Sequence, residues 1–238
     1  ISFTVQPGKT IGIMGATGAG KSSIIHLLQR LYDVTDGAIY LDDVDIRQLS
    51  LKQLRSSISL VMQDVFLFSD TITENVKLGK KDSISLQAVK DAAGDAMAKD
   101  FIERMANQYD TVIGERGVGL SGGQKQRILL AKVLAQQTPV LFLDEPTTGL
   151  DMVYQEEIFR FARELALMGK TVLMVVHELN LAAKYCGRIL LLGEGKLLAD
   201  DTPERVFTEP LLSRAYAADI AVSRNPLNNN LEITTRVD

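Results

Sequence analysis

The chain has 238 residues, of which 46% are hydrophobic and 24% are charged, and its formal net charge is −4. This balance is ordinary for a globular α/β protein with a sizeable core, and the negative charge argues against nucleic-acid binding through bulk electrostatics. The longest apolar runs are strand-sized, far below the ~18–20 residues of a membrane-spanning helix. The single cysteine, Cys186, excludes an internal disulfide and favours a reducing compartment.

Short apolar runs that end in polar or glycine-rich turns recur along the chain. They cover residues 10–15, 58–63, 139–145, 171–178 and 188–193. Near-continuous Val, Ile and Leu runs of this length are typical of strands buried on both faces of a parallel sheet. Helical patterns lie between them, at 21–32, at 85–106 in two pieces, at 122–136 and at 152–168. This alternation predicts a doubly wound α/β core.

The two ends and the middle of the chain complete the predicted organisation. The first residues, ISFTV, predict a strand, and because the chain starts with Ile1 rather than Met, we expect its true start to lie upstream. A Pro/Asn cluster at 225–230 separates two alternating runs, which predicts a terminal hairpin. The stretch 82–136 has no convincing strand, so we expect a helical subdomain beside a catalytic core formed by 1–81 and 137–238 within a single domain.

A glycine-rich turn follows the first of the buried strands. Gly15 is followed after four residues by Gly20, Lys21 and Ser22, which is the phosphate-loop pattern. Glycines let consecutive amides point at phosphate oxygens, and the next helix directs its positive end at the same anion. We expect Lys21 to contact the outer phosphates and Ser22 to bind Mg²⁺. The predicted nucleotide-binding residues here are Gly15, Ala16, Thr17, Gly18, Ala19, Gly20, Lys21, Ser22 and Ser23.

Two acidic residues and a histidine follow the next buried strands. Asp144 and Glu145 end one strand and His177 ends the following one. Ligands of open α/β sheets lie at the carboxyl ends of strands, so these residues and the phosphate loop share one edge. Asp144 is suited to hold Mg²⁺ through water, and Glu145 to orient or deprotonate an attacking water. The strand-end position of His177 supports contact with the terminal phosphate, whereas His26, inside the first helix, is expected only to pack there.

A second glycine cluster, Ser121-Gly122-Gly123-Gln124, directly precedes a predicted helix. Ser121 is a good N-cap, and the two glycines leave the helix N-terminus open to an anion, although an ordinary capped helix has the same spacing. The first loop already binds the phosphates, so one chain alone does not need a second phosphate site. Two chains that meet head to tail would need it, because each would close the nucleotide bound by the other. The cluster therefore predicts ATP-driven dimerisation.

The phosphate loop and the motifs LSGGQ, LFLDEP, TGLD and VVHE, in this order, resemble the ATP-binding subunit of ABC transporters. The resemblance covers nearly the whole chain and implies a P-loop NTPase fold, with a mostly parallel core sheet, an antiparallel β portion and a helical subdomain. It implies Mg²⁺-dependent ATP hydrolysis that powers a membrane permease at the cytoplasmic face of a membrane. By this resemblance Gln63 senses the γ-phosphate and metal site, Asp151 belongs to the loop that links the two sites, and His177 is a switch residue. The residues implied to contact ATP across the dimer are Ser121, Gly122, Gly123 and Gln124.

The chain departs from the family in two respects. Only fourteen residues precede Gly15, so the aromatic residue on which the family stacks adenine is expected to be missing. The first 135 residues resemble exporters, including the segment Gly114–Gly117, whereas the part from Asp144 onward resembles importers of iron chelates, haem or cobalamin. A recombined or engineered chimera and a natural family with mixed features both account for this mosaic. The substrate and the direction of transport stay open.

An apolar segment directly after Gln63 suggests where the membrane partner docks. Phe66, Leu67 and Phe68 are expected to form an apolar groove for a short helix of the membrane domain, with local packing as the alternative. Two other functions compete with transport: a soluble ABC-type ATPase acting on nucleic acid or the ribosome, and a regulatory module that binds ATP without turnover. The sequence lacks the long insertions or the second ATPase domain that are expected of the soluble ATPases. Glu145 and His177 argue against a module without turnover. A small-molecule kinase would leave LSGGQ without a role.

Overall fold

The main sheet of the computed structural model, which describes residues 1–62, 66–78, 83–114 and 117–236, has the strand order β4-β5-β6-β1-β7-β8. Its strands are β1 (Thr10–Met14), β4 (Ile58–Val61), β5 (Val140–Asp144), β6 (Thr171–Val175), β7 (Arg188–Gly193) and β8 (Lys196–Asp201). The first five in spatial order run parallel, and β8 returns antiparallel to β7. The apolar runs of the sequence therefore form the predicted parallel core. The strand predicted over 171–178 ends at Val175, so His177 lies in the loop after it.

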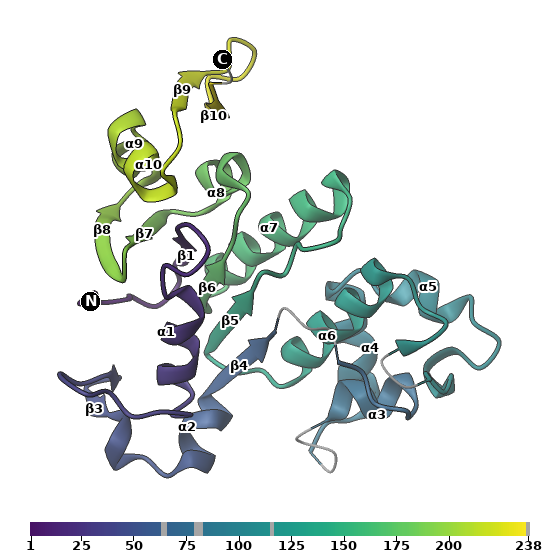
Figure 1. The fold of residues 1–238 in the computed structure, drawn as a ribbon. Helices are drawn as coiled ribbons and strands as arrows, with labels where there is room; N and C mark the ends of the chain where they lie inside the picture. The colour runs from purple at the N-terminus through teal and green to yellow at the C-terminus, as the bar shows by residue number, and fades with distance from the viewer. Residues whose placement is uncertain (63–65, 79–82, 115–116, 237–238) are drawn as a thin grey trace.

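The sheet is buried on both faces, because successive side chains of a strand point to opposite sides. Ile11 and Ile13 of β1 belong to one apolar cluster, together with Ile25 and Leu54 from helices on that face, and Met14 belongs to the other. The helices on the first face are α1 (Lys21–Leu28) and α2 (Leu51–Ser57), and those on the second are α7 (Met152–Leu167) and α8 (Leu179–Tyr185). Figure 1 shows this layered core, with α1 and α7 on opposite sides of the strands.

A group of helices lies beside the sheet, beyond β4 (Figure 1). These are α3 (Ile72–Lys77), α4 (Leu86–Asp95), α5 (Lys99–Glu103) and α6 (Gly122–Ala135), with the 3-10 turn η2 (Gln108–Asp110). The two helical pieces predicted within 85–106 are α4 and α5, separated by Met97 in a left-handed conformation (φ 54°). Helix α6 packs on both α3 and α4, so the helix that follows the LSGGQ motif belongs to this group.

The C-terminal part packs on the core as the predicted hairpin and two short helices. Its elements are α9 (Pro203–Val206), α10 (Glu209–Tyr216), β9 (Ile220–Arg224) and β10 (Leu231–Thr235). Strands β9 and β10 pair antiparallel. The Asn180 amide of α8 ties the hairpin to the core, because its Oδ1 accepts from Ile233 N (2.8 Å) and its Nδ2 donates to Ile233 O (3.4 Å).

Two local predictions are wrong. Residues 1–6 form no strand, since no neighbouring segment of the described chain pairs with them, although Phe3 and Val5 still pack against the core. Helix α1 ends at Leu28 rather than near residue 32, because Arg30 adopts a left-handed conformation (φ 48°) and its guanidinium donates to the carbonyl of Ile46 (3.1 Å). The antiparallel β portion near the N-terminus is short: β2 (Tyr40–Leu41) and β3 (Val44–Asp45), followed by the 3-10 turn η1 (Ile46–Gln48).

Candidate nucleotide-binding and catalytic site

The glycine-rich turn connects β1 to α1 and has the backbone of a phosphate cradle. Gly15, Gly18 and Gly20 have φ angles of 147°, 81° and 94°, which side-chain-bearing residues rarely adopt. A Cβ on Gly15 would lie 2.3 Å from the carbonyl oxygen of Leu192, so no other residue fits there. At Gly18 and Gly20 a Cβ would meet nothing within 4 Å. This side of the loop therefore has space for a ligand the size of a phosphate group.

Lys21, the first residue of α1, is buried beneath this loop. Its Nζ donates to the carbonyls of Gly15 (2.7 Å) and Ala16 (3.1 Å). Burial lowers the Lys21 pKa, whereas the carboxylates of Glu145 and Asp144 raise it. The structure thus brings the loop, its lysine and the two acidic residues together. Of the other predicted loop residues, Ala19 is buried and the exposed ones are Thr17, Gly18, Ser22 and Ser23.

Asp144 is the last residue of β5, where it is half-buried. Burial raises the Asp144 pKa most, and neighbouring Glu145 raises it further. The nearby His26, Lys21 and His177 lower it, so positive and titratable groups surround this carboxylate. His26 was expected only to pack within its helix. Its ring lies edge-on to the Tyr32 ring, with the two ring centroids 6.1 Å apart.

Glu145 follows β5 in a strained backbone conformation with a φ of 46°, and its amide donates to the carbonyl of Val175 (2.9 Å). Its two carboxylate oxygens each have a partner. His177 Nε2 lies 2.7 Å from Oε1, and Thr148 Oγ1 donates to Oε2 (3.3 Å). The carboxylate is therefore fixed in direction while its side chain stays 18% exposed. Sequence reasoning missed Thr148; its position three residues after Glu145, inside a turn, was the available signal.

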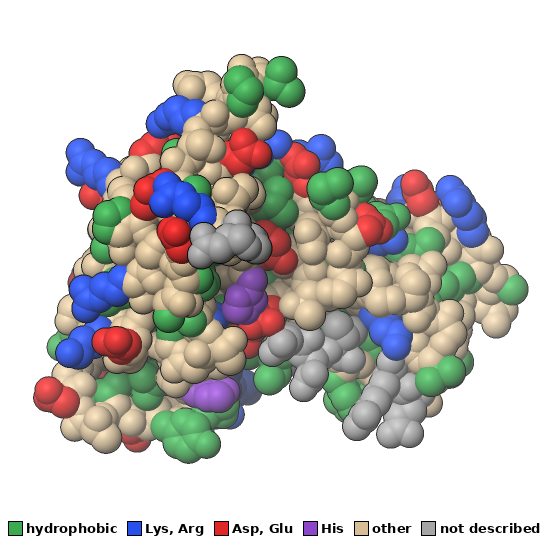
Figure 2. Space-filling view, turned by 45° about the horizontal axis from the view of Figure 1, so that its top comes forward, with side chains coloured by type: hydrophobic (Ala, Val, Ile, Leu, Met, Phe, Trp, Pro, Cys, Tyr) green, Lys and Arg blue, Asp and Glu red, His purple; other side chains and the backbone are tan. Residues whose placement is uncertain are grey.

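These residues meet because β5, β6 and β1 are adjacent and parallel, so their carboxyl ends lie at one edge of the sheet. Figure 2 shows both histidines of the chain on one face, one of them against acidic side chains in a hollow of the surface. Basic side chains are scattered over this face rather than gathered in one patch.

The second glycine cluster lies elsewhere, at the start of α6. Ser121 and Gln124 form a capping box, in which Gln124 N donates to Ser121 Oγ (3.3 Å) and Ser121 N donates to Gln124 Oε1 (2.9 Å). A Cβ on Gly122 would lie 4.0 Å from the carbonyl oxygen of Gly149, so this turn lies against the loop that leads to α7. Figure 1 places α6 across β4 and β5 from α1. The structure therefore does not bring these residues to the phosphate loop of the same chain.

Asp151 is the N-cap of α7, and its Oδ1 accepts from the amides of Val153 (3.1 Å) and Tyr154 (3.2 Å). It is exposed and lies just after the turn that contacts the second glycine cluster. Asp151 and Ser121 are thus neighbours in space, each capping its own helix. The family resemblance implied only that Asp151 belongs to a loop that links the two sites, and its place beside the Ser121 turn is seen in the structure.

The proposed docking segment divides into buried and exposed residues. Gln63 lies outside the described residues. Leu67 is 1% exposed and packs in the core, which corrects the expectation that it lines a groove. Phe66 and Phe68 are 47% and 46% exposed, and their rings pack edge to face with centroids 4.9 Å apart. An exposed aromatic pair therefore remains at this position.

The C-terminal region supports the back of the phosphate loop, a contact that sequence reasoning missed. The Tyr216 hydroxyl of α10 is buried near the backbone of Gly15 but makes no hydrogen bond within the described residues, and burial raises its pKa to about 12. Helix α10 packs on β7, whose Leu192 carbonyl closes the other side of Gly15. No local pattern links position 216 to position 15, so only the tertiary fold shows this contact.

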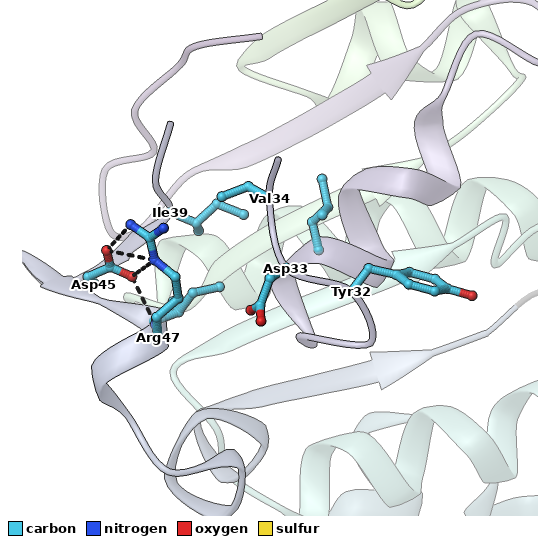
Figure 3. A pocket seen from close by; sticks show the side chains of 8 residues that line it. Tyr32, Asp33, Val34, Ile39, Asp45 and Arg47 are labelled. Atoms are coloured by element: carbon cyan, nitrogen blue, oxygen red, sulfur yellow. Dashed lines mark hydrogen bonds and ion pairs between the residues drawn. The ribbon is translucent and has the colours of Figure 1, made fainter. Parts of the chain in front are cut away.

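A separate small hollow lies at the far end of α1 from the phosphate loop. Figure 3 shows the Asp45–Arg47 ion pair (2.6 Å) on one side of it, with the Tyr32 ring pointing away from that pair. None of the predicted site residues lines it. The candidate site is therefore the open edge of the sheet and not this hollow.

Comparison with known proteins identifies the family. The family model described as ABC transporter matches residues 1–148, more than half of the chain. The chain belongs to the ABC transporter family. A β-(1→2)glucan export ATP-binding/permease protein, NdvA, of Rhodopseudomonas palustris (strain BisA53) is 40% identical to this ABC chain over 93% of it. An ATP-dependent lipid A-core flippase of Coxiella burnetii (strain RSA 493 / Nine Mile phase I) is 40% identical over 91%.

The solved structure of a bacterial Atm1-family ABC exporter with ATP bound has a TM-score of 0.80 and 38% identity to this ABC chain. It covers 86% of this chain. The similarity to exporters thus extends well past residue 135. The chain spans only 36% of the length of the two curated relatives and 35% of the solved exporter chain. Among the residues that the structure describes, no helix has the length and apolar character needed to cross a bilayer.

Proposed function

We propose that this chain binds ATP and hydrolyses it with Mg²⁺ in a dimer of ATP-binding domains, and that hydrolysis drives export through a membrane domain. The observation that supports hydrolysis most is the cluster of Lys21, Asp144, Glu145 and His177 at the edge of the sheet where the phosphate cradle opens. The names of the relatives, which include an export protein and a flippase, support transport outward. The membrane domain would choose the substrate.

Each residue of the cluster has a separate role in the proposed hydrolysis. Glu145 is oriented by His177 and Thr148, so its carboxylate can accept a proton from an attacking water in a fixed direction. Lys21 would exchange its bonds to the loop carbonyls of Gly15 and Ala16 for phosphate oxygens. Such catalysis depends on positioning and charge rather than on covalent chemistry.

The donor set at this edge fits magnesium. Mg²⁺ binds few protein oxygens and keeps water and phosphate oxygens as its other ligands. The Ser22 hydroxyl at the start of α1 and the Asp144 carboxylate would hold it, with the Gln63 amide as a further predicted ligand. When bound, the ion neutralises phosphate charge. Neighbouring positive groups keep Asp144 suited to this role, because they oppose the rise of its pKa by burial.

The remaining predicted residues are proposed to serve partners at the cytoplasmic face of a membrane. The Ser121–Gln124 turn and Asp151 would close the nucleotide of a second ATP-binding domain, since in one chain they lie across the sheet from α1. The exposed Phe66–Phe68 pair would receive the membrane domain. We propose that residues 82–136 act as the helical subdomain, which connects closure of the partner's nucleotide with docking of the membrane domain. No nucleic-acid partner is expected.

The Glu145→Gln variant tests the proposed hydrolysis. We expect phosphate release to fall at least ~100-fold, the range lost when a general base is removed, while ATP affinity changes little. The variant should also accumulate a dimer in the presence of ATP and Mg²⁺, measured by light scattering. Glu164→Gln, the same change on an exposed position of α7, is the control. Parental turnover in Glu145→Gln would show that Glu145 is not the base, and a parent that releases no phosphate would contradict ATP hydrolysis itself.

A further inference from the structure

One arginine of α6 joins three separate segments of the chain. Arg127 Nε donates to the carbonyl of Gly123 (3.3 Å), and Nη1 donates to the carbonyl of Met97 (3.1 Å). Its guanidinium also lies over two aromatic rings, 5.3 Å from the Phe101 centroid and 4.6 Å from the Tyr154 centroid. Gly123 begins α6, Met97 and Phe101 belong to the α4–α5 region, and Tyr154 belongs to α7 of the core.

The chemistry of arginine suits this position. A planar guanidinium stacks on aromatic faces and still directs its N–H groups outward in its own plane, which a lysine ammonium does not do. Arg127 and Tyr154 are both half-buried, so the interaction is partly shielded from water. The side chain therefore holds the helical group against α7 and at the same time fixes the first turn of α6.

A second contact between these two segments lies four residues before the Arg127–Tyr154 contact. A Cβ on Gly123 would lie 3.7 Å from Leu150 Cδ2, so Leu150 packs against this glycine. Arg127 follows Gly123 by four residues of α6, about one helical turn, and Tyr154 follows Leu150 by four residues across the N-cap of α7. The contacts Gly123–Leu150 and Arg127–Tyr154 thus align the start of α6 with the start of α7, where Asp151 is the N-cap.

A small hollow lies beside these contacts, between the two helices. It is lined by Met97, Gly123, Gln126, Arg127, Leu130, Leu150, Tyr154, Glu157 and Ile158. Atoms that line such a hollow make fewer dispersion contacts, so each direct contact across it contributes more to the packing of the two elements. Arg127 and Tyr154 are the pair that bridges this hollow through a direct ring contact.

We propose that Arg127 is a positioning residue, which holds Ser121–Gly123 and Asp151 in one arrangement so that both reach the nucleotide of a second copy together. The inference rests on the proposed function, in which these residues close the partner's site. Arg127 itself touches neither the phosphate loop nor the Glu145 cluster. Its loss should therefore impair the dimer-dependent step and leave ATP binding at the chain's own loop intact.

Kinetics of matched variants test this role. Arg127→Met keeps the length of the side chain and removes the charge and the planar group, Tyr154→Leu removes the ring, and Tyr154→Phe keeps it. We expect maximal phosphate release to fall about tenfold or more in Arg127→Met and Tyr154→Leu, as for misplaced reacting groups, with ATP affinity within about twofold of the parent. Tyr154→Phe and the exposed control Arg104→Met should match the parent. The double variant should lose no more than the worse single variant, because both changes break one contact.

Hydrogen exchange of the nucleotide-free chain gives a readout that does not depend on turnover. We expect the amides of 121–127 and 152–155 to exchange about fivefold faster in Arg127→Met, with β1 and β6 unchanged, since only a local opening becomes easier. Parental exchange in both segments, or parental phosphate release, would overturn the positioning role, as would an equal loss of ATP affinity. If the parent itself hydrolyses no ATP, the proposed function fails, and the exchange result still decides whether Arg127 positions the two segments.

Discussion

At the scale of single residues, Cys186 offers a probe of the core. Its side chain is 4% exposed at the end of α8, and its Sγ lies 3.2 Å from the position of a Cβ on Gly12 of β1. Burial raises the thiol pKa from 9.0 to about 12. Only the thiolate reacts with disulfide and alkylating reagents, so the folded chain should protect this cysteine.

The same pKa shift predicts how stability depends on pH. Between pH 9 and 12 the unfolded chain loses the thiol proton while the folded chain keeps it, so the unfolded state is favoured and stability falls as pH rises. Between pH 9 and 10 the free energy of unfolding should fall by about 1 kcal/mol more in the parent than in Cys186→Ala. Urea unfolding of both chains at the two pH values measures this difference. Equal pH dependence in the two chains would show that the thiol is not protected.

The residue types of the site are predictable from sequence, but their local conformations are not. Lys21 belongs to a recognisable phosphate-loop pattern, Asp144 and His177 follow recognisable apolar runs, and the structure brings the three together. The positive φ of Glu145 accompanies a hydrogen bond from its amide to the carbonyl of Val175 in β6, which no local sequence pattern indicates. The same holds for Tyr216, because no local pattern places its buried hydroxyl near the backbone of Gly15 at the other end of the chain.

At the scale of elements, a buried asparagine orders the loop that presents the exposed aromatic pair. Asn75 of α3 is 2% exposed. Its Oδ1 accepts from Phe68 N (2.8 Å), and its Nδ2 donates to the carbonyls of Phe68 (3.0 Å) and Thr71 (2.9 Å). The side chain satisfies both backbone groups of Phe68 as a neighbouring strand would. The aromatic pair is therefore held in place before any partner binds.

Asn75→Leu keeps the volume of the side chain and removes every one of these bonds. We expect the free energy of unfolding to fall by about 1–3 kcal/mol, because the N–H of Phe68 loses its acceptor, whereas the carbonyls of Phe68 and Thr71 keep the bonds from the amides of Asp70 and Asn75. Urea unfolding measures this, with Asn107→Leu as control, since Asn107 is exposed and its side chain caps no helix. The control should change stability by less than about 0.5 kcal/mol. An equally small effect at Asn75 would show that the loop does not depend on it.

Elements whose own residue pattern determines their structure were predicted well. Elements whose structure depends on contacts with distant segments were not. The runs that became β1, β5 and β7 are apolar on both faces, so their pattern alone identifies them. The ISFTV segment has a strand-like pattern, but a strand also needs a partner, and none lies beside it in the described chain. The end of α1 depends on contacts of Arg30 with a turn that follows later in the chain.

At the scale of the whole molecule, the sheet order separates two groups of functional residues. The phosphate loop and the Glu145 cluster share the edge formed by β5, β6 and β1. The Ser121 turn lies beyond β4, in the helical group. The sequence predicts both groups from their motifs, but their separation within one chain follows from the strand order. That separation is the structural support for a site shared by two chains.

A mixing experiment tests the shared site directly. Lys21→Ala should inactivate a chain's own phosphate loop. Ser121→Asp keeps a side chain that caps α6 but adds a negative charge beside the partner's phosphates. We expect each variant alone to lose nearly all phosphate release, because both sites of a symmetric dimer then contain a defect.

An equal mixture of these two variants should recover activity. In a mixed dimer, the intact loop of the Ser121→Asp chain meets the intact Ser121 turn of the Lys21→Ala chain, which makes one complete site. Half of the dimers are mixed and each has one of two sites, so recovery should approach about a quarter of the parental rate. Phosphate release measured across mixing ratios should peak at equal amounts. Recovery that is absent at every ratio, with both variants folded and the Ser121→Asp chain still binding ATP, would count against a site divided between two chains.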